Sequence, residues 1–476
     1  MSGDSLQTDQ TFGLRSANDA SGHELMNGSQ HRQDAPARLA AALSRLGAIV
    51  ALWICALMTV LNLGSQLPAR ATHWDFSIYY MSVALLHEGQ NPYTTDFGPI
   101  SQRLGLEAGE IRRATDPPTF LLLMKPLALM PERVAYYTWV SLNTGFLALA
   151  LLLLLRRARA FQAKTVLVLS ALALLYPPVG WHFLNAQSKI LLLLLLVTMM
   201  RLMERGSDRT AGLCLAAAGL LRIFPLLLIG YLFVQRRWTM LIWTLIGLTA
   251  GGLITLGLLG ASYTLSYFDT VRALGAQHVP WMSSEVSANV ALGPAVSRLL
   301  SFILGSNPHL PMGFFRHAVV LGAQTALFCA TVLATAKLKP GEDPDWRALS
   351  LWVIASVLLS PTAWVYYMVL FLIPFAQLAG STSGASQRAQ WAAILSYLVI
   401  VATSVPLAPI AGIVYARYGR EPARWFMSMM VEGWSVSAIL AYLAAYWFTV
   451  DASSSRKEAS DHQGRVDEFG SACISR

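Results

Sequence analysis

The chain has 476 residues, of which 55% are hydrophobic and only 13% are charged. Its mean hydropathy of +0.49 is too high for a soluble globular domain and favours a protein embedded in lipid. The net charge of +9 does not indicate a nucleic-acid-binding surface, because the basic residues stand in short loops between apolar segments, such as 156–164 and 235–238. Cytoplasmic anchors of membrane helices have this distribution.

Both ends of the chain are polar. Residues 1–40 are mixed in charge and too long for the charged start of a cleavable signal peptide, so we expect a disordered cytoplasmic leader. Residues 451–476 lack periodicity and are predicted to form a cytoplasmic tail. Three of the four cysteines lie in apolar segments and the fourth in the tail, which predicts neither a disulfide framework nor a metal site.

Residues 41–450 are predicted to form an all-α integral membrane domain. Apolar segments stand near 42–66, 118–131, 134–155, 165–181, 187–203, 211–235, 239–260, 290–305, 316–336, 347–360, 364–379, 391–411 and 432–449. Segments of roughly 20 apolar residues span a hydrocarbon core of about 30 Å, and in lipid they must be helical. The segment at 118–131 is shorter and carries Lys125, which favours a short, tilted or re-entrant helix.

The basic residues predict the sidedness of most loops. Counting them places 201–209, 236–237, 337–339 and Arg388 inside. Two loops conflict with the number of crossings. If 118–131 and 134–155 both cross, the basic loop 156–164 falls outside, and if 211–235 crosses once, its two basic flanks fall on opposite sides. We therefore expect 10 to 13 spans with one or two half-helices, and the side of 156–164 stays open.

Two polar stretches, 67–117 and 261–289, are long enough to hold a site, and both fall outside if the leader is inside. Residues 76–89 form an amphipathic pattern, for which we expect a helix along the interface with its tyrosines at headgroup level. Asp75 directly precedes this pattern. Aromatic neighbours such as Tyr79, Tyr80 and Tyr93 can bind sugars, and they raise the basicity of a carboxylate by removing water.

One series of residues in the first loop, taken with five later stretches, resembles a known family. The series is Asp75, Phe76, Tyr79, Tyr80, Ala84, Leu85, Leu86, Gly89, Pro92 and Tyr93. The later stretches are 116–131, 185–194, 211–238, 287–300 and 358–374. The family patterns that they resemble are, in the same order, a Pro-Pro helix opening, Gly-Gln-x-Asn, Lys-x-x-Pro, Asn-Gln-Ser-x-x-Gly and Ser-Pro-x-x-Trp-x-His-His. Together they resemble glycosyltransferase family 87, membrane enzymes of the GT-C fold that use polyprenyl-phosphate sugars.

The resemblance implies a GT-C-like multi-span bundle with a large first extracytoplasmic loop. It implies a multi-pass protein of the cell membrane that transfers a hexose, with mannose the first expectation, from a polyprenyl-phosphate sugar to a lipid or glycan acceptor on the extracytoplasmic side, with inversion. It also implies that Asp75 is the general base, a role worth about 10² to 10⁴ in rate. The expected partners are the donor, the acceptor and membrane lipid, with no nucleic acid and a monomeric chain.

The chain departs from the family pattern at several positions. Arg222 stands in place of a lysine, Ala186 in place of a glycine, Val290 in place of a glutamine, and Tyr366 and Tyr367 in place of two histidines. The full set of residues predicted to bind substrate is Tyr79, Tyr80, Tyr93, Gln187, Lys189, Arg222, Asn289, Trp364, Tyr366 and Tyr367.

Arg222 is the first candidate to stabilise a departing phosphate, because an arginine inside an apolar segment should face a partner or an aqueous cavity. Snorkelling towards the cytoplasmic surface is the alternative. Lys189 and His182 are weaker candidates, and a histidine there can be merely interfacial. The Gln187 side chain fits two roles: hydrogen bonding to sugar hydroxyls, or capping and facing water at the start of a helix.

Other polar and aromatic residues have a structural alternative as well. Trp364 and the two tyrosines that follow fit either a donor site or an interfacial aromatic belt. Pro361 predicts a helix break. Asp116 stands directly before Pro117 and Pro118, a pattern that favours a helix N-cap over a catalytic acid.

The sequence contains no Walker loop, no His-Glu-x-x-His and no glycine-rich nucleotide turn. A lipid-linked donor is therefore favoured over a nucleotide sugar, with no cofactor and no metal. The runner-up is a transporter or lipid flippase, although transport sites tend to lie at the bilayer midplane rather than in an aromatic outer loop. A non-catalytic family member is the third possibility.

Overall fold

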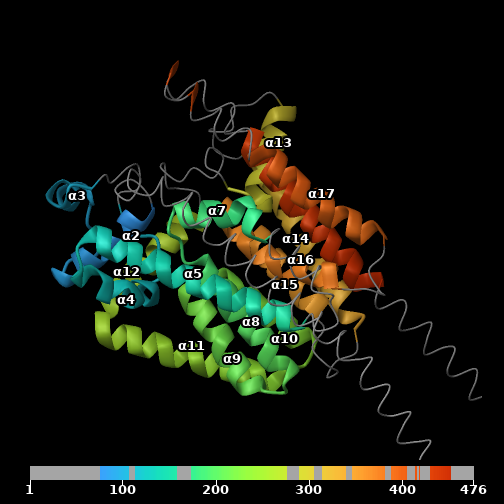
Figure 1. The fold of residues 1–476 in the computed structure, drawn as a ribbon, viewed down its shortest axis with the longest axis horizontal. Helices are drawn as coiled ribbons and strands as arrows, with labels where there is room; N and C mark the ends of the chain where they lie inside the picture. The colour runs from blue at the N-terminus through green and yellow to red at the C-terminus, as the bar shows by residue number, and fades with distance from the viewer. Residues whose placement is uncertain are drawn as a thin grey trace, which may run out of the picture.

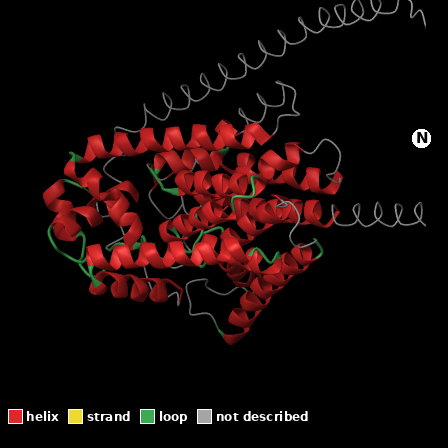
Figure 2. Cartoon of the chain, turned by 90° about the horizontal axis from the view of Figure 1, so that it is seen from below, coloured by secondary structure: helices red, strands yellow, loops and turns green. Residues whose placement is uncertain are grey.

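The computed structural model describes residues 75–106, 113–157, 173–275, 289–304, 313–338, 346–380, 387–404, 413–414, 417–418 and 429–451. Within this part of the chain the structure is helical and contains no strand, so the predicted all-α membrane protein is confirmed (Figures 1 and 2). The only extended pairing among these residues is an isolated bridge between Asn289 and Trp364. The predicted leader, the first apolar segment at 42–66 and the C-terminal tail after Asp451 lie outside the described residues.

The helices in the first half of the chain are α2 (Asp75–His87), α3 (Gly98–Leu104), α4 (Pro118–Met124), η1 (Lys125–Leu129), α5 (Glu132–Arg157), α7 (Pro177–Leu184), α8 (Lys189–Glu204), α9 (Asp208–Leu221), η2 (Phe224–Leu227), α10 (Leu228–Val234) and α11 (Trp238–Leu259). Those in the second half are α12 (Ala261–Gly275), α13 (Leu292–Ile303), α14 (Phe314–Ala336), α15 (Trp346–Leu358), η4 (Val365–Phe371), α16 (Leu372–Gly380), α17 (Gln387–Ser404) and a C-terminal helix, Met429–Asp451.

Four of the described helices are long and apolar enough to cross a membrane, namely α5, α11, α14 and the C-terminal helix. Large apolar side chains stand exposed on α11 and α14, for example Leu253, Leu258 and Leu333. Such exposure suits contact with lipid, since an apolar helix surface needs no protein cover in a bilayer. The predicted 10 to 13 spans stay a prediction.

The segment at 118–131 is broken, as its length predicted. Helix α4 has 7 residues and passes directly into the 5-residue 3₁₀ helix η1. At about 1.5 to 2 Å per residue the pair is too short to cross a hydrocarbon core. A segment that does not cross takes one span out of the count that places 156–164 outside. The side of that loop, whose residues 158–164 lie outside the described part of the chain, stays a prediction.

The segment at 211–235 is a hairpin rather than one span. Helix α9 stops before Arg222, whose backbone is extended, and η2 and α10 then lead the chain back. Arg237 pairs with Asp208 at 3.6 Å, so the two flanks of the hairpin meet. Both basic flanks therefore lie on the same side, and the second parity conflict disappears.

Helices α9 and α11 pack closely through glycines. A Cβ on Gly212 would lie 2.5 Å from the carbonyl oxygen of Met240, and one on Gly247 would lie 2.7 Å from Cβ of Ala216. Thr244 Oγ1 also donates to the carbonyl oxygen of Gly212 at 3.2 Å. Small residues at such a seam let two membrane helices approach, which fixes α9 and the hairpin tip against a long apolar helix.

Contacts between helix ends gather basic segments at one end of the bundle. Gln235, beside the hairpin flanks, donates to the carbonyl oxygen of Thr335 near the end of α14 at 2.9 Å. Trp352 of α15 donates to Oγ1 of the same threonine at 2.8 Å. The Arg347 guanidinium lies 4.7 Å from the ring centroid of Phe448, and the first turn of α17 pairs with the end of the C-terminal helix. The basic ends of these elements therefore share one side.

The first predicted outer loop folds into a small core of its own at the opposite end. Helices α2, α3 and α4 bury Phe76, Met81, Phe97 and Phe120 against the start of α5. Helix α12, from the second predicted outer loop, covers this core from the side (Figure 1). The predicted helix at 76–89 exists as α2, but it has no apolar face left for lipid, because α2 is buried on nearly all sides and Tyr79 is 2% exposed. Its depth relative to the membrane interface stays a prediction.

Candidate active site

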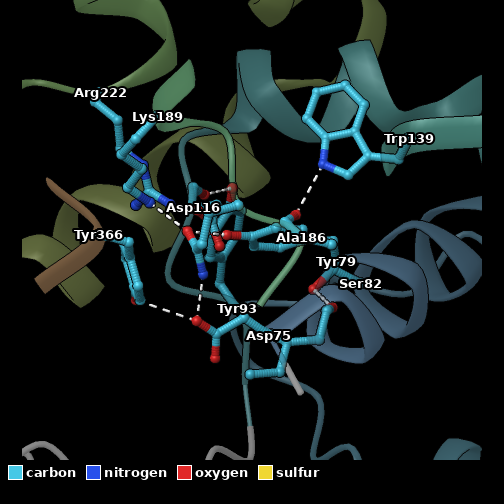
Figure 3. A network of polar contacts seen from close by, with 12 residues as sticks. Asp75, Tyr79, Ser82, Tyr93, Asp116, Trp139, Ala186, Lys189, Arg222 and Tyr366 are labelled. Atoms are coloured by element: carbon cyan, nitrogen blue, oxygen red, sulfur yellow. Dashed lines mark hydrogen bonds and ion pairs between the residues drawn. The ribbon is translucent and has the colours of Figure 1, made fainter. Parts of the chain in front are cut away.

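Asp75 is the first residue of α2, where the helix dipole favours an acidic side chain. Its side chain is half-buried and points towards two segments distant in the sequence (Figure 3). Gln187 Nε2 donates to Oδ2, and the hydroxyl of Tyr366 donates to the same oxygen at 3.1 Å. Oδ1 makes no hydrogen bond or ion pair with any residue that the structure describes. One carboxylate oxygen is thus held and the other is left for a ligand.

The surroundings of Asp75 perturb its acidity. Burial raises the pKa of the Asp75 carboxyl above its usual range, because the charged form loses water. The Lys189 ammonium and the hydrogen bond from Tyr366 oppose this rise, and the negative charge of Asp116 adds to it. A carboxylate with a raised pKa is a stronger base, which suits proton abstraction from an alcohol.

Gln187 connects Asp75 to the rest of the site. Its Oε1 accepts a hydrogen bond from the hydroxyl of Tyr79 at 2.7 Å and another from Lys189 Nζ. The sequence left open a helix-start role for Gln187, and the structure instead places its amide, 2% exposed, between a carboxylate and an ammonium.

The turn that presents Gln187 explains the glycine in the family motif. Ala186 has φ +44°, in the left-handed region that disfavours a side chain. Its carbonyl oxygen accepts from Trp139 Nε1 at 2.8 Å, which anchors the turn to α5. His182 is fully buried and its Nε2 accepts from the amide of Ile190 at 3.0 Å, so this histidine ties α7 to α8 and is not interfacial.

Lys189 is the first residue of α8 and is 1% exposed. Its Nζ lies 5.0 Å from the ring centroid of Tyr366 and 4.7 Å from that of Tyr367, distances typical of cation–π contacts. Both tyrosines stand on η4, a 7-residue 3₁₀ helix that follows the predicted break at Pro361. They are buried, so the aromatic-belt alternative is wrong for these two residues.

An ion pair lies beside the network of Asp75, Gln187 and Lys189. Arg222, at the tip of the hairpin, pairs with Asp116, and the hydroxyl of Tyr93 donates to the Asp116 carbonyl oxygen at 2.7 Å (Figure 3). Snorkelling is therefore wrong for Arg222, because the 14 residues of α9 separate it from the basic flank by about 21 Å.

The N-cap prediction for Asp116 is also wrong. The residue before α4 is Pro117, and no side chain caps the helix. Asp116 is instead a buried partner of an arginine 106 residues away. An unpaired arginine in an apolar hairpin needs a nearby acid, and that requirement was the one signal in the sequence that could have indicated Asp116.

Three of the predicted residues lie at the edge of this network. Tyr80 turns away, and its hydroxyl donates to the carbonyl oxygen of Met130 at 2.8 Å. Asn289 holds the segment before η4, because its Oδ1 accepts from the amide of Ala363 at 2.9 Å and its Nδ2 donates to Pro361. Trp364 is half-buried and stacks on Tyr366. Substrate binding by these three stays a prediction.

Helix α12 contributes a residue that the sequence did not indicate. Tyr267 is 6% exposed, and its ring centroid lies 5.6 Å from that of Tyr93. Asn91, in the turn after α2, donates to Ser266 at 3.0 Å, which attaches α12 to the first loop. The signal was weak, because a tyrosine in an outer segment is common near membranes.

The structure brings eight of the predicted residues together. These are Asp75, Tyr79, Tyr93, Gln187, Lys189, Tyr366 and Arg222, with Tyr367 beside them. Among the described residues, no group of three or more histidine, cysteine, aspartate or glutamate side chains is placed to hold a metal ion. Metal independence stays a prediction.

Comparison with known proteins gives one family. The model of glycosyltransferase family 87 matches residues 115–361, which is 247 of 476 residues and just over half of the chain. The matched region includes Asp116, Gln187, Lys189 and Arg222, while Asp75 and the two tyrosines of η4 lie outside it. No curated protein matches the chain. The chain therefore belongs to glycosyltransferase family 87.

Proposed function

We propose that this membrane glycosyltransferase moves a hexose, with mannose the first choice, from a polyprenyl-phosphate sugar to a hydroxyl of a lipid or glycan acceptor. Asp75 acts as the general base, and the anomeric configuration inverts. The proposal is supported most directly by the Asp75 carboxylate, which is fixed through Oδ2 by two donors and carries no hydrogen bond on Oδ1 from the described residues. A base needs that combination of fixed orientation and one available oxygen.

The proposed chemical step is a single displacement. The acceptor hydroxyl transfers its proton to Oδ1 of Asp75 as its oxygen forms a bond to the anomeric carbon. The bond between that carbon and the phosphate oxygen breaks, and the polyprenyl phosphate leaves with the electron pair. One negative charge thus moves from the carboxylate to the phosphate.

Arg222 is suited to receive this developing charge. Asp116 occupies one of its terminal nitrogens, whereas its Nε is buried without a hydrogen-bond partner among the described residues. A buried guanidinium N–H without a partner is costly, and a phosphate oxygen would supply the missing acceptor. The unpaired Nε supports a role for Arg222 in stabilising the departing phosphate, with Asp116 holding the guanidinium in place.

The distribution of charge supports an extracytoplasmic site. The basic helix ends gather on one side of the bundle, with the Asp208–Arg237 pair among them, and basic residues favour the cytoplasmic side of a membrane. The Asp75 network stands at the other end. The apolar surfaces around the helices suit a donor and an acceptor that are dissolved in the membrane.

A donor screen tests the proposal. The purified protein is reconstituted in liposomes containing polyprenyl-phosphate mannose, the corresponding glucose or arabinose lipid, or a nucleotide sugar, each labelled in the sugar. We expect transfer to an added membrane-extract acceptor from a lipid-linked donor only, and nuclear magnetic resonance of the product should show the inverted anomer.

Each other result identifies an alternative. Transfer from the nucleotide sugar would refute the lipid-linked donor. Movement of labelled lipid across the bilayer without any transfer would support a flippase. Binding of the donor with neither transfer nor movement would support a non-catalytic member of the family.

A further inference from the structure

The orientation of the Gln187 amide decides whether Asp75 Oδ2 faces a hydrogen-bond donor or another oxygen. A glutamine side chain offers an acceptor oxygen and a donor NH₂ at nearly equivalent positions, so turning it over replaces one by the other. In the structure Nε2 faces Asp75 Oδ2 as a donor, and Oε1 faces Lys189 and Tyr79. With the opposite orientation, two oxygens would meet, and the carboxylate would lose a hydrogen bond.

Lys189 is the group that fixes this orientation. An ammonium has three donors and no acceptor, so Lys189 Nζ can donate to the Gln187 oxygen but cannot pair with the Gln187 NH₂, whereas the Tyr79 hydroxyl can donate or accept. The faces of Tyr366 and Tyr367 hold the ammonium in position at 5.0 and 4.7 Å. No carboxylate of the described residues lies within ion-pair distance of Lys189, which therefore reaches Asp75 through Gln187.

We infer that Lys189 is a positioning residue for the base: it orients the Gln187 amide, and through it holds the Asp75 carboxylate with Oδ1 turned towards the substrate. The inference rests on the proposed function for its catalytic meaning. Its structural part, the control of Asp75 by Lys189, concerns the protein without substrate.

Several groups from different elements face Asp75. They are Lys189 of α8, Tyr366 and Tyr367 of η4, Tyr79 of α2, Asp116 before α4 and Arg222 at the hairpin tip. The cations and the Tyr366 hydrogen bond lower the pKa of Asp75, and Asp116 raises it. Removing Lys189 takes away a positive charge and frees the amide that donates to Oδ2. Both changes disfavour the carboxylate, so the pKa of Asp75 should rise further.

The test is an infrared titration of Asp75 in Lys189→Met and Lys189→Arg. The band of the protonated carboxylic acid is assigned by difference from Asp75→Asn, and no substrate is needed. We expect Lys189→Met to move the midpoint by about one pH unit or more towards alkaline pH, as loss of a nearby opposite charge does. Lys189→Arg, which keeps a cation with donors only, should stay within a few tenths of a unit of wild type.

Arg201→Met is the matched control. It removes a cation from the same helix, about 18 Å along its axis from Lys189, and should leave the midpoint unchanged. Thermal unfolding of each variant checks that it folds. Where transfer is measurable, the acid limb of its pH profile should move with the infrared midpoint.

Two results would overturn the inference. One is a folded Lys189→Met that titrates Asp75 at the wild-type pH, and the other is a Lys189→Arg variant that shifts as far as the methionine variant. Failure of the proposed function would look different, since transfer would be absent in wild type while the infrared shift remained.

Discussion

The buried pair of Asp116 and Arg222 predicts a strong asymmetry between single and double substitution. The two side chains are 4% and 15% exposed. Removing one partner leaves the other charge buried and unpaired, which costs about 3–5 kcal/mol, whereas replacing both by uncharged groups of similar size is close to neutral. Asp116→Asn and Arg222→Met should therefore each destabilise the protein by about 3–5 kcal/mol, and the double variant should recover most of that loss.

The assay is a double-mutant cycle on unfolding in mixed micelles, with helicity followed as the fraction of denaturing detergent rises. The pair of Arg388 and Asp451 is the control, because Arg388 is 61% exposed and such pairs contribute only about 0–1 kcal/mol. We expect a coupling of at least about 2 kcal/mol for the buried pair, as contacting residues show. Additive single effects, with a coupling below about 0.5 kcal/mol, would refute the pairing of Arg222 with Asp116 and would favour the alternative that Arg222 snorkels towards the cytoplasmic surface.

Three further predictions concern local geometry. Ala186→Gly should stabilise the protein by about 1 kcal/mol in the same unfolding assay, because glycine adopts φ +44° without strain, and a loss of stability would contradict this. Gly212→Ala should destabilise by about 1–3 kcal/mol through a clash with the backbone of α11, whereas Gly252→Ala, which meets nothing within 4 Å, should not. Tyr366→Phe removes a donor to the Asp75 carboxylate, so the pKa of Asp75 should rise, and because the base must be ionised, the acid limb of the transfer profile should move to higher pH; an unmoved limb would exclude the hydrogen bond.

Local rules and charge counting predicted much of the fold. Apolar segment lengths indicated the helices, Pro361 indicated the break before η4, and the failed parity at 211–235 indicated a segment that does not simply cross. The counting could not show how the chain resolves the conflict. That depends on Arg222 finding Asp116, a contact between residues 106 positions apart.

The difference between local patterns and contacts distant in the sequence also separates the correct site predictions from the incorrect ones. Asp75 and Gln187 belong to motifs whose order is visible in the chain, and the structure brings them together. Asp116 was assigned to a helix cap because a local pattern of acid and proline fits that role, and local patterns carry no information on tertiary partners. The role of Tyr366 was ambiguous for a similar reason. From sequence alone, an aromatic residue near the end of a span fits an interfacial aromatic belt and a binding site equally well.

The proposed base is tested most directly by single-turnover transfer in Asp75→Asn, with donor binding measured on the same preparation. We predict a rate lower by about 10² to 10⁴ with donor affinity changed by less than a few fold, because the variant loses only the proton acceptor. Glu88→Gln, which removes an exposed acid just after α2, should transfer at the wild-type rate. Transfer by Asp75→Asn at the wild-type rate would contradict the assignment of Asp75 as the base.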